Sequence, residues 1–387
     1  MKKIGLYLDS VVGGGVYQYN LSILNAVKYL SQNGFDTVIA YSNDGWCEYL
    51  NQNQIKSKKI SHTIFSKIWF QTHRPLSLWR KLSPYFDKFS KSFIDEQCDL
   101  WVFPSQDIWS YCLPIDTMVT VHDLMHRYER IFPEASSKRM YKTRERHYSR
   151  ISKYAKLIFV DSIIGKNQMI ESYGTNHKKI HTLPYIPPEY IFKKDNIIDI
   201  HQLYNLPKKY IFYPAQFWLH KNHKSLLEAT LRMKKQYPNI FLVFVGQRKN
   251  GYNSINNFIK KYNLSENIKI LDYVPNEHMS ELYKAAQAMI MPTFFGPTNI
   301  PPLEAMALGC PVAISNIYAM PEQIGDAGLL FNPNSVDEIV DIMTKLWTND
   351  KLVNSLREKG FEKSKEWQQT QFNERFLNLI KQGLEIN

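Results

Sequence analysis

The chain has 387 residues, which is enough for two domains that each bury a hydrophobic core. Hydrophobic residues make up 44% of the sequence and aromatic residues 14%, well above the composition of disordered chains. With 48 Lys and Arg against 36 Asp and Glu, the formal net charge is +12. This charge favours an anionic partner such as a nucleotide phosphate, an anionic lipid or a nucleic acid, and it also fits a merely solvated basic surface.

Cysteine spacing and the lengths of apolar runs indicate the cellular compartment in which the protein works. The start of the chain is basic and then apolar, but Asp9 interrupts it too early for a signal peptide. No uninterrupted apolar run approaches the ~18 residues of a membrane span. Scattered cysteines without zinc-type spacing indicate free thiols in a reducing compartment, so we expect a cytoplasmic protein. The cysteines are Cys47, Cys98, Cys112 and Cys310.

The first glycine cluster lies between a predicted strand at residues 3–8 and a predicted helix that starts at Val16. Here Gly13-Gly14-Gly15 would let backbone N–H groups approach a phosphate. The dinucleotide fingerprint needs a further glycine where this chain has Gln18, which argues against a NAD enzyme. A plain tight turn fits the cluster as well as a ligand loop does.

Residues 65–94 interleave cations with aromatic side chains. Apolar residues recur there at three- and four-residue spacing, which predicts a helical stripe with a kink at Pro84. One interpretation is a core-facing helix with a solvated basic face, and the other is a surface that rests on anionic lipid. The cations are Lys67, Arg74, Arg80, Lys81, Lys88 and Lys91, and the stripe is Leu78, Leu82, Phe86, Phe89 and Phe93.

Further strands are predicted at 35–41, 99–103 and 117–121, and the last of these runs directly into His122-Asp123. Side chains at the carboxyl ends of parallel strands face the ligand-binding side of an open α/β sheet. His122 and His126 are four residues apart, but the glutamate of the HExxH zinc motif is missing. A basic helix, a strand at 157–160 and an N-cap at Ser162 follow.

The second half of the chain repeats the α/β alternation after a proline-rich linker. A strand is predicted at 210–214, and the next, at 241–245, ends at Gly246, a position suited to close backbone approach. A strand at 288–291 then leads into the segment 292–302, where repeated prolines predict a rigid loop. Helical character resumes at Leu303, which would place Glu304 in the first turn, and Gly309 ends the helix.

Residues 301–312, together with Pro321-Glu322 and residues 325–331, resemble the donor-binding core of the family 4 glycosyltransferases, also called glycosyl transferases group 1. These are retaining enzymes that use nucleotide-activated sugars. The resemblance implies the GT-B fold, which is α/β with two Rossmann-like domains facing a central cleft. It implies an acceptor domain at 1–185, a linker at 186–208, a donor domain at 209–365, and a C-terminal helix at 366–387 that packs back on the first domain.

The same resemblance implies roles for particular residues. His122 stands where a histidine contacts the donor sugar, Lys221 where a lysine binds the diphosphate, and Glu304 where a glutamate accepts from ribose hydroxyls. We expect no metal site, because no Asp-x-Asp pair is evident in a cleft position. We also expect no cofactor, because the nucleotide diphosphate sugar is itself a substrate. The expected catalytic residues are His122, Lys221 and Glu304, and the expected donor-binding residues are Gly13, Gly14, Gln216, Gly246, Thr298, Asn299, Ile300 and Glu304.

Two positions depart from the family pattern. The pattern has a glutamate where this chain has Gly296, and an arginine where it has Gln216. Two explanations of Gly296 are open: Thr298 and Asn299 take over contacts with sugar hydroxyls, or the donor is a deoxy or otherwise modified sugar.

The expected function is retaining transfer of a hexose to a glycan or an undecaprenyl-linked glycan in bacterial surface polysaccharide synthesis, such as that of the lipopolysaccharide O-antigen. A mannose-like sugar from a GDP-sugar is favoured. Alternatives are a sugar-nucleotide epimerase on the same fold and a sugar-nucleotide-binding protein with degraded chemistry. Nucleic-acid binding is the weakest, since no recognised module accompanies the charge. We also expect peripheral contact with the anionic inner face of the cytoplasmic membrane.

Overall fold

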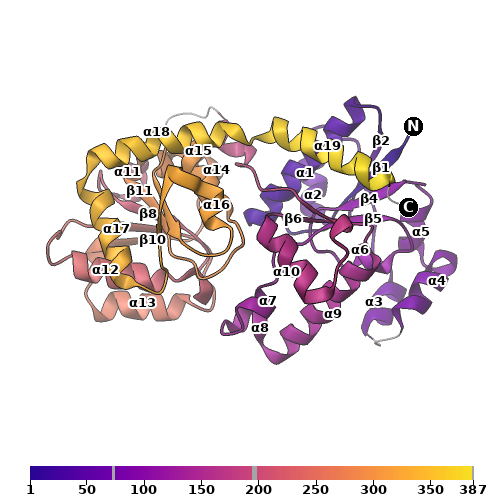
Figure 1. The fold of residues 1–387 in the computed structure, drawn as a ribbon, viewed down its shortest axis with the longest axis horizontal. Helices are drawn as coiled ribbons and strands as arrows, with labels where there is room; N and C mark the ends of the chain where they lie inside the picture. The colour runs from indigo at the N-terminus through magenta and orange to yellow at the C-terminus, as the bar shows by residue number, and fades with distance from the viewer. Residues whose placement is uncertain (72–74, 194–197, 386–387) are drawn as a thin grey trace. The chain divides into compact units, whose positions relative to one another are not determined.

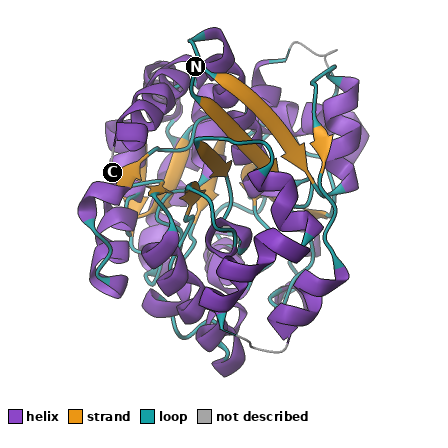
Figure 2. Cartoon of the chain, turned by 90° about the vertical axis from the view of Figure 1, so that its right-hand side faces the viewer, coloured by secondary structure: helices purple, strands orange, loops and turns teal. Residues whose placement is uncertain are grey.

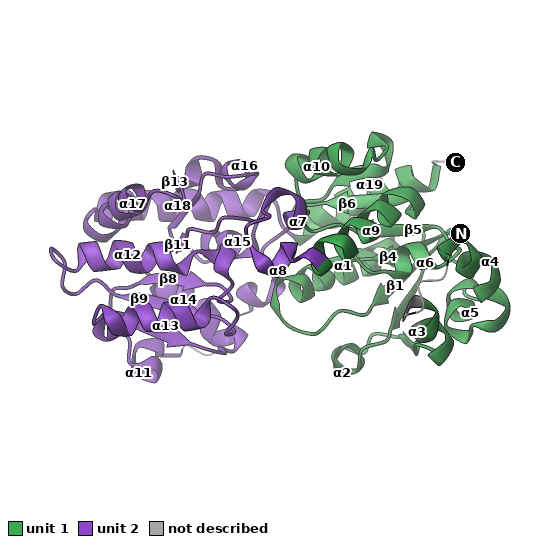
Figure 3. Ribbon diagram, turned by 90° about the horizontal axis from the view of Figure 1, so that it is seen from below, with its two compact units in different colours: residues 1–124, 139–184, 369–387 green, residues 125–138, 185–368 purple. Residues whose placement is uncertain are grey.

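The structure is a computed structural model that describes residues 1–71, 75–193 and 198–385. The chain divides into two compact units (Figure 3). Unit 1 comprises residues 1–124, 139–184 and 369–387, and unit 2 comprises residues 125–138 and 185–368. Each unit is built around one parallel sheet flanked by helices (Figures 1 and 2). The predicted α/β class with two Rossmann-like halves is confirmed.

The sheet of unit 1 has the strand order β3-β2-β1-β4-β5-β6-β7. Its central strands are buried apolar runs, as expected where helices cover both faces of a parallel sheet. Ile4, for example, pairs in register with Thr37 on one side and Leu100 on the other. The strands are β1 (Lys3–Leu8), β2 (Asp36–Tyr41), β3 (Lys58–Lys59), β4 (Leu100–Phe103), β5 (Thr117–Thr120), β6 (Leu157–Val160) and β7 (Ile180–Thr182).

The final helix, α19 (Gln369–Glu385), belongs to unit 1. It lies against α1 (Gly14–Gln32), and the Gln369 side chain donates to the Ser22 carbonyl at 3.0 Å. The other helices of unit 1 are α2 (Asp44–Gln52), α3 (Ile64–Gln71), α4 (Leu76–Phe86), α5 (Lys88–Ile94), α6 (Trp109–Cys112), α9 (Lys138–Tyr154) and α10 (Ile163–Tyr173), with a 3₁₀ turn η1 (His177–Lys179).

Residues 65–94 form separate short helices rather than one kinked helix, so that prediction was wrong. The break after α4 has a local cause. Asp87 takes an extended conformation and caps α5, accepting from the Ser90 N–H at 2.9 Å. The predicted stripe divides accordingly: Phe89 and Phe93 are buried, whereas Leu78, Leu82 and Phe86 are exposed. Arg74 lies outside the described residues.

The sheet of unit 2 has the strand order β10-β9-β8-β11-β12-β13. Its strands are β8 (Ile211–Pro214), β9 (Leu242–Val245), β10 (Ile268–Leu271), β11 (Ala288–Met291), β12 (Val312–Ser315) and β13 (Gly328–Phe331). Its helices are α7 (Met125–Tyr128), α8 (Pro133–Ser136), α11 (Ile200–Tyr204), α12 (His223–Met233), α13 (Tyr252–Lys261), α14 (Asn276–Ala285), α15 (Ile300–Ala307), α16 (Met320–Ile324), α17 (Val336–Thr348) and α18 (Asp350–Glu366). Its 3₁₀ turns are η2 (Glu189–Phe192), η3 (Leu219–Lys221), η4 (Ser265–Asn267) and η5 (Gly325–Ala327).

The expected linker at 186–208 contains regular structure, the turn η2 and the helix α11. Asp199 caps α11 by accepting from the N–H groups of His201 and Gln202, and Ile200 is buried in the core of unit 2. Because prolines disfavour helix interiors, the sequence predicted a linker here and not the helix that Asp199 caps.

Residues 125–138, which we expected in the first domain, group with unit 2 instead. Phe132 stacks on Phe294 with ring centroids 5.7 Å apart. The Tyr318 hydroxyl donates to Glu129 at 2.5 Å. Apolar packing therefore attaches the segment to the loop after β11, and the hydrogen bond attaches it to the loop after β12; neither loop is near the segment in sequence.

Acid should destabilise the protein partly through His223. This side chain is 1% exposed and stacks on Phe217, and burial lowers its pKa to about 3. The unfolded chain, with a pKa near 6.5, therefore binds more protons than the folded one as the pH falls from about 6.5 to about 3. Stability should decrease with falling pH by up to about 1.4 kcal/mol per unit from this group. Chemical unfolding of His223→Phe between pH 7 and pH 4.5 should show a shallower slope than the wild type. Equal slopes would exclude the contribution.

Candidate active site

The candidate site of unit 2 is formed by loops that follow two adjacent strands. β8 and β11 pair in register, Phe212 beside Met289, so the loops at their carboxyl ends lie together. The Phe294 N–H donates to the His220 carbonyl at 2.8 Å. The Asn222 side chain donates to the Pro292 carbonyl at 2.9 Å. These bonds fix residues 215–222 against residues 292–299.

Lys221 and Asn299 meet where these loops join. The Lys221 ammonium donates to the Asn299 side-chain oxygen, with 3.2 Å between Nζ and Oδ1. Asn299 is 9% exposed, and its own backbone is fixed by Gln323, which accepts from the Asn299 N–H at 3.1 Å and donates to its carbonyl at 2.6 Å. Two residues predicted on separate motifs are thus in direct contact.

Gly296 is explained by Asn299. Its φ of 137° suits glycine, and a Cβ added there would lie 2.5 Å from Asn299 Nδ2. The Asn299 amide therefore occupies the space into which a side chain at position 296 would project. Thr298 and Ile300, which flank Asn299, are half-buried.

Glu304 lies in the second turn of its helix, so its predicted place in the first turn was wrong. α15 begins at Ile300, with Pro301 and Pro302 in the first turn. Proline is tolerated there because the first N–H groups of a helix have no partner within the helix. Gly309, with a φ of +68°, follows the end of the helix as predicted.

The Glu304 carboxylate is buried and bonded by two tyrosines. Tyr190 donates to Oε1 at 2.8 Å and Tyr283 to Oε2 at 2.6 Å. Burial raises the pKa of Glu304, and the two phenol donors oppose that shift. A carboxylate has about four acceptor positions, so a ligand hydroxyl could share this group with the phenols. Sequence reasoning found neither tyrosine, since nothing local marks them as partners of Glu304.

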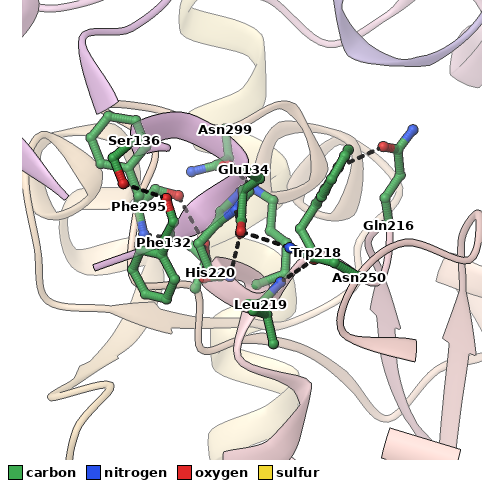
Figure 4. Close-up of polar contacts among 12 residues, drawn as sticks. Phe132, Glu134, Ser136, Gln216, Trp218, Leu219, His220, Asn250, Phe295 and Asn299 are labelled. Atoms are coloured by element: carbon green, nitrogen blue, oxygen red, sulfur yellow. Dashed lines mark hydrogen bonds and ion pairs between the residues drawn. The ribbon is translucent and has the colours of Figure 1, made fainter. Parts of the chain in front are cut away.

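Gln216 and Gly246 lie at the carboxyl ends of β8 and β9. The Trp218 indole donates to the Gln216 side-chain oxygen at 2.9 Å (Figure 4), so the oxygen is engaged and the amide N–H groups face away from the indole. A Cβ at Gly246 would lie 2.3 Å from the Ala215 carbonyl oxygen. The close backbone approach expected at Gly246 is therefore made by the neighbouring loop of the protein itself.

Glu134 holds the loop that carries Lys221 (Figure 4). Its Oε1 accepts from the backbone N–H of His220 at 3.1 Å and contacts His220 Nδ1 at 2.8 Å. Its Oε2 accepts from Asn250 at 2.8 Å, and Asn250 in turn accepts from the Leu219 N–H at 3.2 Å. Burial raises the pKa of Glu134, but the bonds from His220 and Asn250 outweigh this and hold it at about 2. Glu134 is 86 residues before His220, which hid it from sequence analysis.

The remaining predicted residues lie in unit 1. Gly13 and Gly14 have φ values of 126° and 75° at the start of α1, with open space where a side chain would be. His122 follows β5, and its ring makes an edge contact with Tyr19. Burial lowers the pKa of His122 to about 4, with Asp123 opposing, so the imidazole is neutral at pH 7. A neutral imidazole can exchange hydrogen bonds with sugar hydroxyls but adds no charge.

Within residues 1–71, 75–193 and 198–385, no group of three or more His, Cys, Asp or Glu side chains could hold a metal ion. In the same part of the chain, no helix has the length and apolar character needed to cross a bilayer.

The second half of the chain is similar to a known protein family. Residues 195–363 match the family model described as glycosyl transferases group 1. Through this segment the chain is similar to the group 1 glycosyl transferases. The predicted resemblance is confirmed at this level.

Similar proteins include two O-antigen chain mannosyltransferases. The chain is 31% identical over 192 residues to the O-antigen chain mannosyltransferase B of Escherichia coli, an alignment that covers 48% of this chain and 50% of that one. It is 24% identical over 335 residues to the O-antigen chain mannosyltransferase RfbU of Salmonella typhimurium, covering 83% and 84%. The first alignment thus spans only about half of its relative.

Solved structures match nearly the whole chain. Anabaena HepE, in complex with UDP and glucose, has a TM-score of 0.75 at 14% identity and covers 98% of this chain and 100% of its own. WaaG, a glycosyltransferase involved in lipopolysaccharide biosynthesis, has a TM-score of 0.69 at 15% identity, covering 98% and 99%. These likenesses confirm the predicted GT-B fold.

Removing the charge of Glu134 should loosen the Lys221 loop. In Glu134→Gln the bonds from His220 lose charge assistance, which is worth about 1 kcal/mol or more when partly buried. Hydrogen exchange of residues 216–222 should become faster by about fivefold to tenfold. Glu129→Gln is the matched control, because it lies on the same segment but bonds Tyr318 instead. Equal protection of the loop in Glu134→Gln and the wild type would contradict the assigned role.

Proposed function

We propose that this protein transfers a hexose, with retention, from a nucleotide diphosphate sugar to a glycan or an undecaprenyl-linked glycan in bacterial surface polysaccharide synthesis. A mannosyl group from GDP-mannose is the favoured donor sugar. The family match supports glycosyl transfer, and the names of the similar enzymes support mannose and O-antigen synthesis. The observation that carries the proposal is the Lys221–Asn299 contact at the ends of β8 and β11, where open α/β sheets bind ligands.

The chemistry follows from what this chain's residues can do. The bond from the anomeric carbon to the diphosphate oxygen breaks, and negative charge grows on the departing diphosphate. The Lys221 ammonium stabilises that charge more as it develops than in the bound donor, which favours the transition state. The acceptor hydroxyl bonds to the anomeric carbon on the same face, and its proton passes to the leaving phosphate. Glu304 accepts from the ribose hydroxyls, and neutral His122 bonds the sugar.

One alternative keeps support from a specific observation. Gly296 and Gln216 stand where the family pattern has a glutamate and an arginine, and the Gln216 side-chain oxygen accepts from the Trp218 indole. A protein that binds sugar nucleotides without transferring them would tolerate both features. An epimerase on the same fold would convert the donor with no acceptor present, so acceptor dependence separates it from a transferase.

The proposed activity predicts acceptor-dependent transfer without a metal. Wild-type protein, GDP-mannose and a mannose-terminated undecaprenyl-linked oligosaccharide should give a product whose new linkage keeps the donor's anomeric configuration, as measured by NMR. Activity should persist in EDTA. Lys221→Ala should lower kcat by about a hundredfold or more, in line with the loss of one charged transition-state contact. The same assay with UDP-sugars tests the donor nucleotide.

Consumption of the donor without acceptor would favour the epimerase. Absence of turnover with tight GDP-mannose binding would favour the binding protein. Activity lost in EDTA and restored by magnesium or manganese would contradict metal independence.

The proposal includes peripheral contact with an anionic membrane through α3 and α4 of unit 1. These helices expose a group of large apolar side chains, and Lys81, Lys88 and Lys91 are exposed on α4 and α5. Apolar side chains beside cations suit the interface of an anionic bilayer. The exposed apolar residues are Ile64, Phe65, Ile68, Leu78, Leu82, Tyr85 and Phe86.

Arg80 does not belong to this basic surface, although the sequence suggested that it did. Its guanidinium is partly buried and donates to the backbone carbonyls of Tyr111 and Leu113. Burial lowers the pKa of Arg80. This cation therefore stabilises unit 1 internally.

Vesicle binding should separate the surface cations from Arg80. Lys81, Lys88 and Lys91 changed together to Gln should weaken sedimentation with phosphatidylglycerol vesicles, because each nearby cation contributes about 1 kcal/mol. Thermal stability should stay unchanged, whereas Arg80→Gln should lower it. Binding should disappear as salt approaches molar, where the screening length is about 3 Å. Equal binding to neutral phosphatidylcholine vesicles would rule out the electrostatic contact.

A further inference from the structure

The Asn299 side chain has an unused donor. Its Nδ2 has no hydrogen-bond partner among the residues that the structure describes, although Asn299 is buried, with only 9% of its surface exposed. The orientation of the amide is fixed, because the Lys221 ammonium can only donate and must face the oxygen, Oδ1. A buried N–H group without an acceptor is costly, because it loses its hydrogen bonds to water. A ligand oxygen would satisfy it.

The surroundings of Nδ2 offer donors and positive charge. Lys221 contributes an ammonium on the neighbouring loop. Asn299 is also the N-cap residue of α15, yet its side chain makes no capping bond, so the amide is not used by the helix. The helix N-terminus carries partial positive charge. Together these groups suit an anionic oxygen that only accepts, rather than a sugar hydroxyl that must also donate.

The Asn299 side chain therefore differs chemically from the glutamate that the family pattern has at position 296. A glutamate at position 296 would accept from sugar hydroxyls, whereas the oxygen of Asn299 already accepts from Lys221 and its remaining capacity is in its N–H groups. Gln216, which stands where the family pattern has an arginine, also offers donors. Its side-chain oxygen accepts from the Trp218 indole, so its amide N–H groups can donate to a ligand.

We propose that the Asn299 side-chain amide binds a phosphate oxygen of the nucleoside diphosphate, jointly with Lys221, rather than a hydroxyl of the donor sugar. This inference rests on the proposed function for the identity of the ligand. It assigns Asn299 to the leaving group and replaces the explanation that Asn299 takes over the sugar contacts of the missing glutamate.

The test is an isosteric change that gives opposite results for the two roles. Asn299→Asp puts a carboxylate beside Lys221, where it neutralises the ammonium and repels a diphosphate. Calorimetric titration with GDP and UDP should show affinity at least about tenfold weaker than the wild type, the cost of one charged hydrogen bond. Asn299→Ala should lose about tenfold, less than Asp. The exposed Asn239→Asp, which adds the same charge before β9 and so at the opposite edge of the unit 2 sheet, should bind like the wild type.

A second measurement separates phosphate from sugar. GDP and GDP-mannose should lose affinity by equal factors in Asn299→Asp, because the lost contact belongs to the part that they share. The melting temperature without ligand should be unchanged or higher, since Asp would pair with Lys221, so weak binding would not reflect unfolding. UDP and UDP-glucose serve in parallel if the wild type prefers uridine nucleotides.

The outcomes are distinct. Wild-type affinity for the nucleoside diphosphate in Asn299→Asp would overturn the proposal, and so would a loss confined to the nucleotide sugar. Transfer retained by Asn299→Asp but lost by Asn299→Ala would also overturn it, because a carboxylate can replace an acceptor but not a donor. Failure of the wild-type protein to bind any of these nucleotides would overturn the proposed function itself.

Discussion

Lys221 donates to Asn299 between two loops that leave adjacent strands of unit 2, and the candidate site is built around this hydrogen bond. The bond orients the ammonium, fixes the amide so that its N–H groups are available, and places Asn299 where a side chain at position 296 would otherwise lie. Because β8 and β11 are buried neighbours in a parallel sheet, the sheet fixes the positions at which these two loops begin. Charge stabilisation in a transition state depends on donors that are already in place before reaction.

A layer of buried polar contacts supports this bond. The Tyr213 hydroxyl donates to the Lys221 carbonyl at 2.8 Å, so the lysine backbone is held from the strand below it. Thr293 donates to the His220 carbonyl at 3.1 Å. Glu134 adds a charged acceptor on the other side of the same loop. Groups of this kind are expensive to bury unless their partners are in place, so the network favours one conformation of the loop.

The sequence predicted the features that depend on local patterns. Buried apolar runs located the central strands of both sheets, whereas β3, β7 and β13 were not predicted. Lys221 and Asn299 were placed on the loops that follow β8 and β11, as the structure has them. Features that depend on contacts distant in sequence were missed. Glu134, Tyr190 and Tyr283 carry no local signal of their partners. Pro301 and Pro302 were assigned to a loop because proline disfavours helix interiors, yet the first turn of α15 tolerates them. Arg80 was predicted to be a surface cation, because nothing near it in sequence indicates that its guanidinium bonds the backbone carbonyls of Tyr111 and Leu113.

The most direct test of the site is a crystal structure of the wild-type protein with GDP, or with UDP if that nucleotide binds more tightly. The account predicts a phosphate oxygen within about 2.7–3.2 Å of both Lys221 Nζ and Asn299 Nδ2, with the bond between their side chains kept or only slightly lengthened. A complex in which the phosphates lie elsewhere, with Asn299 Nδ2 facing a ribose or no ligand atom at all, would contradict it.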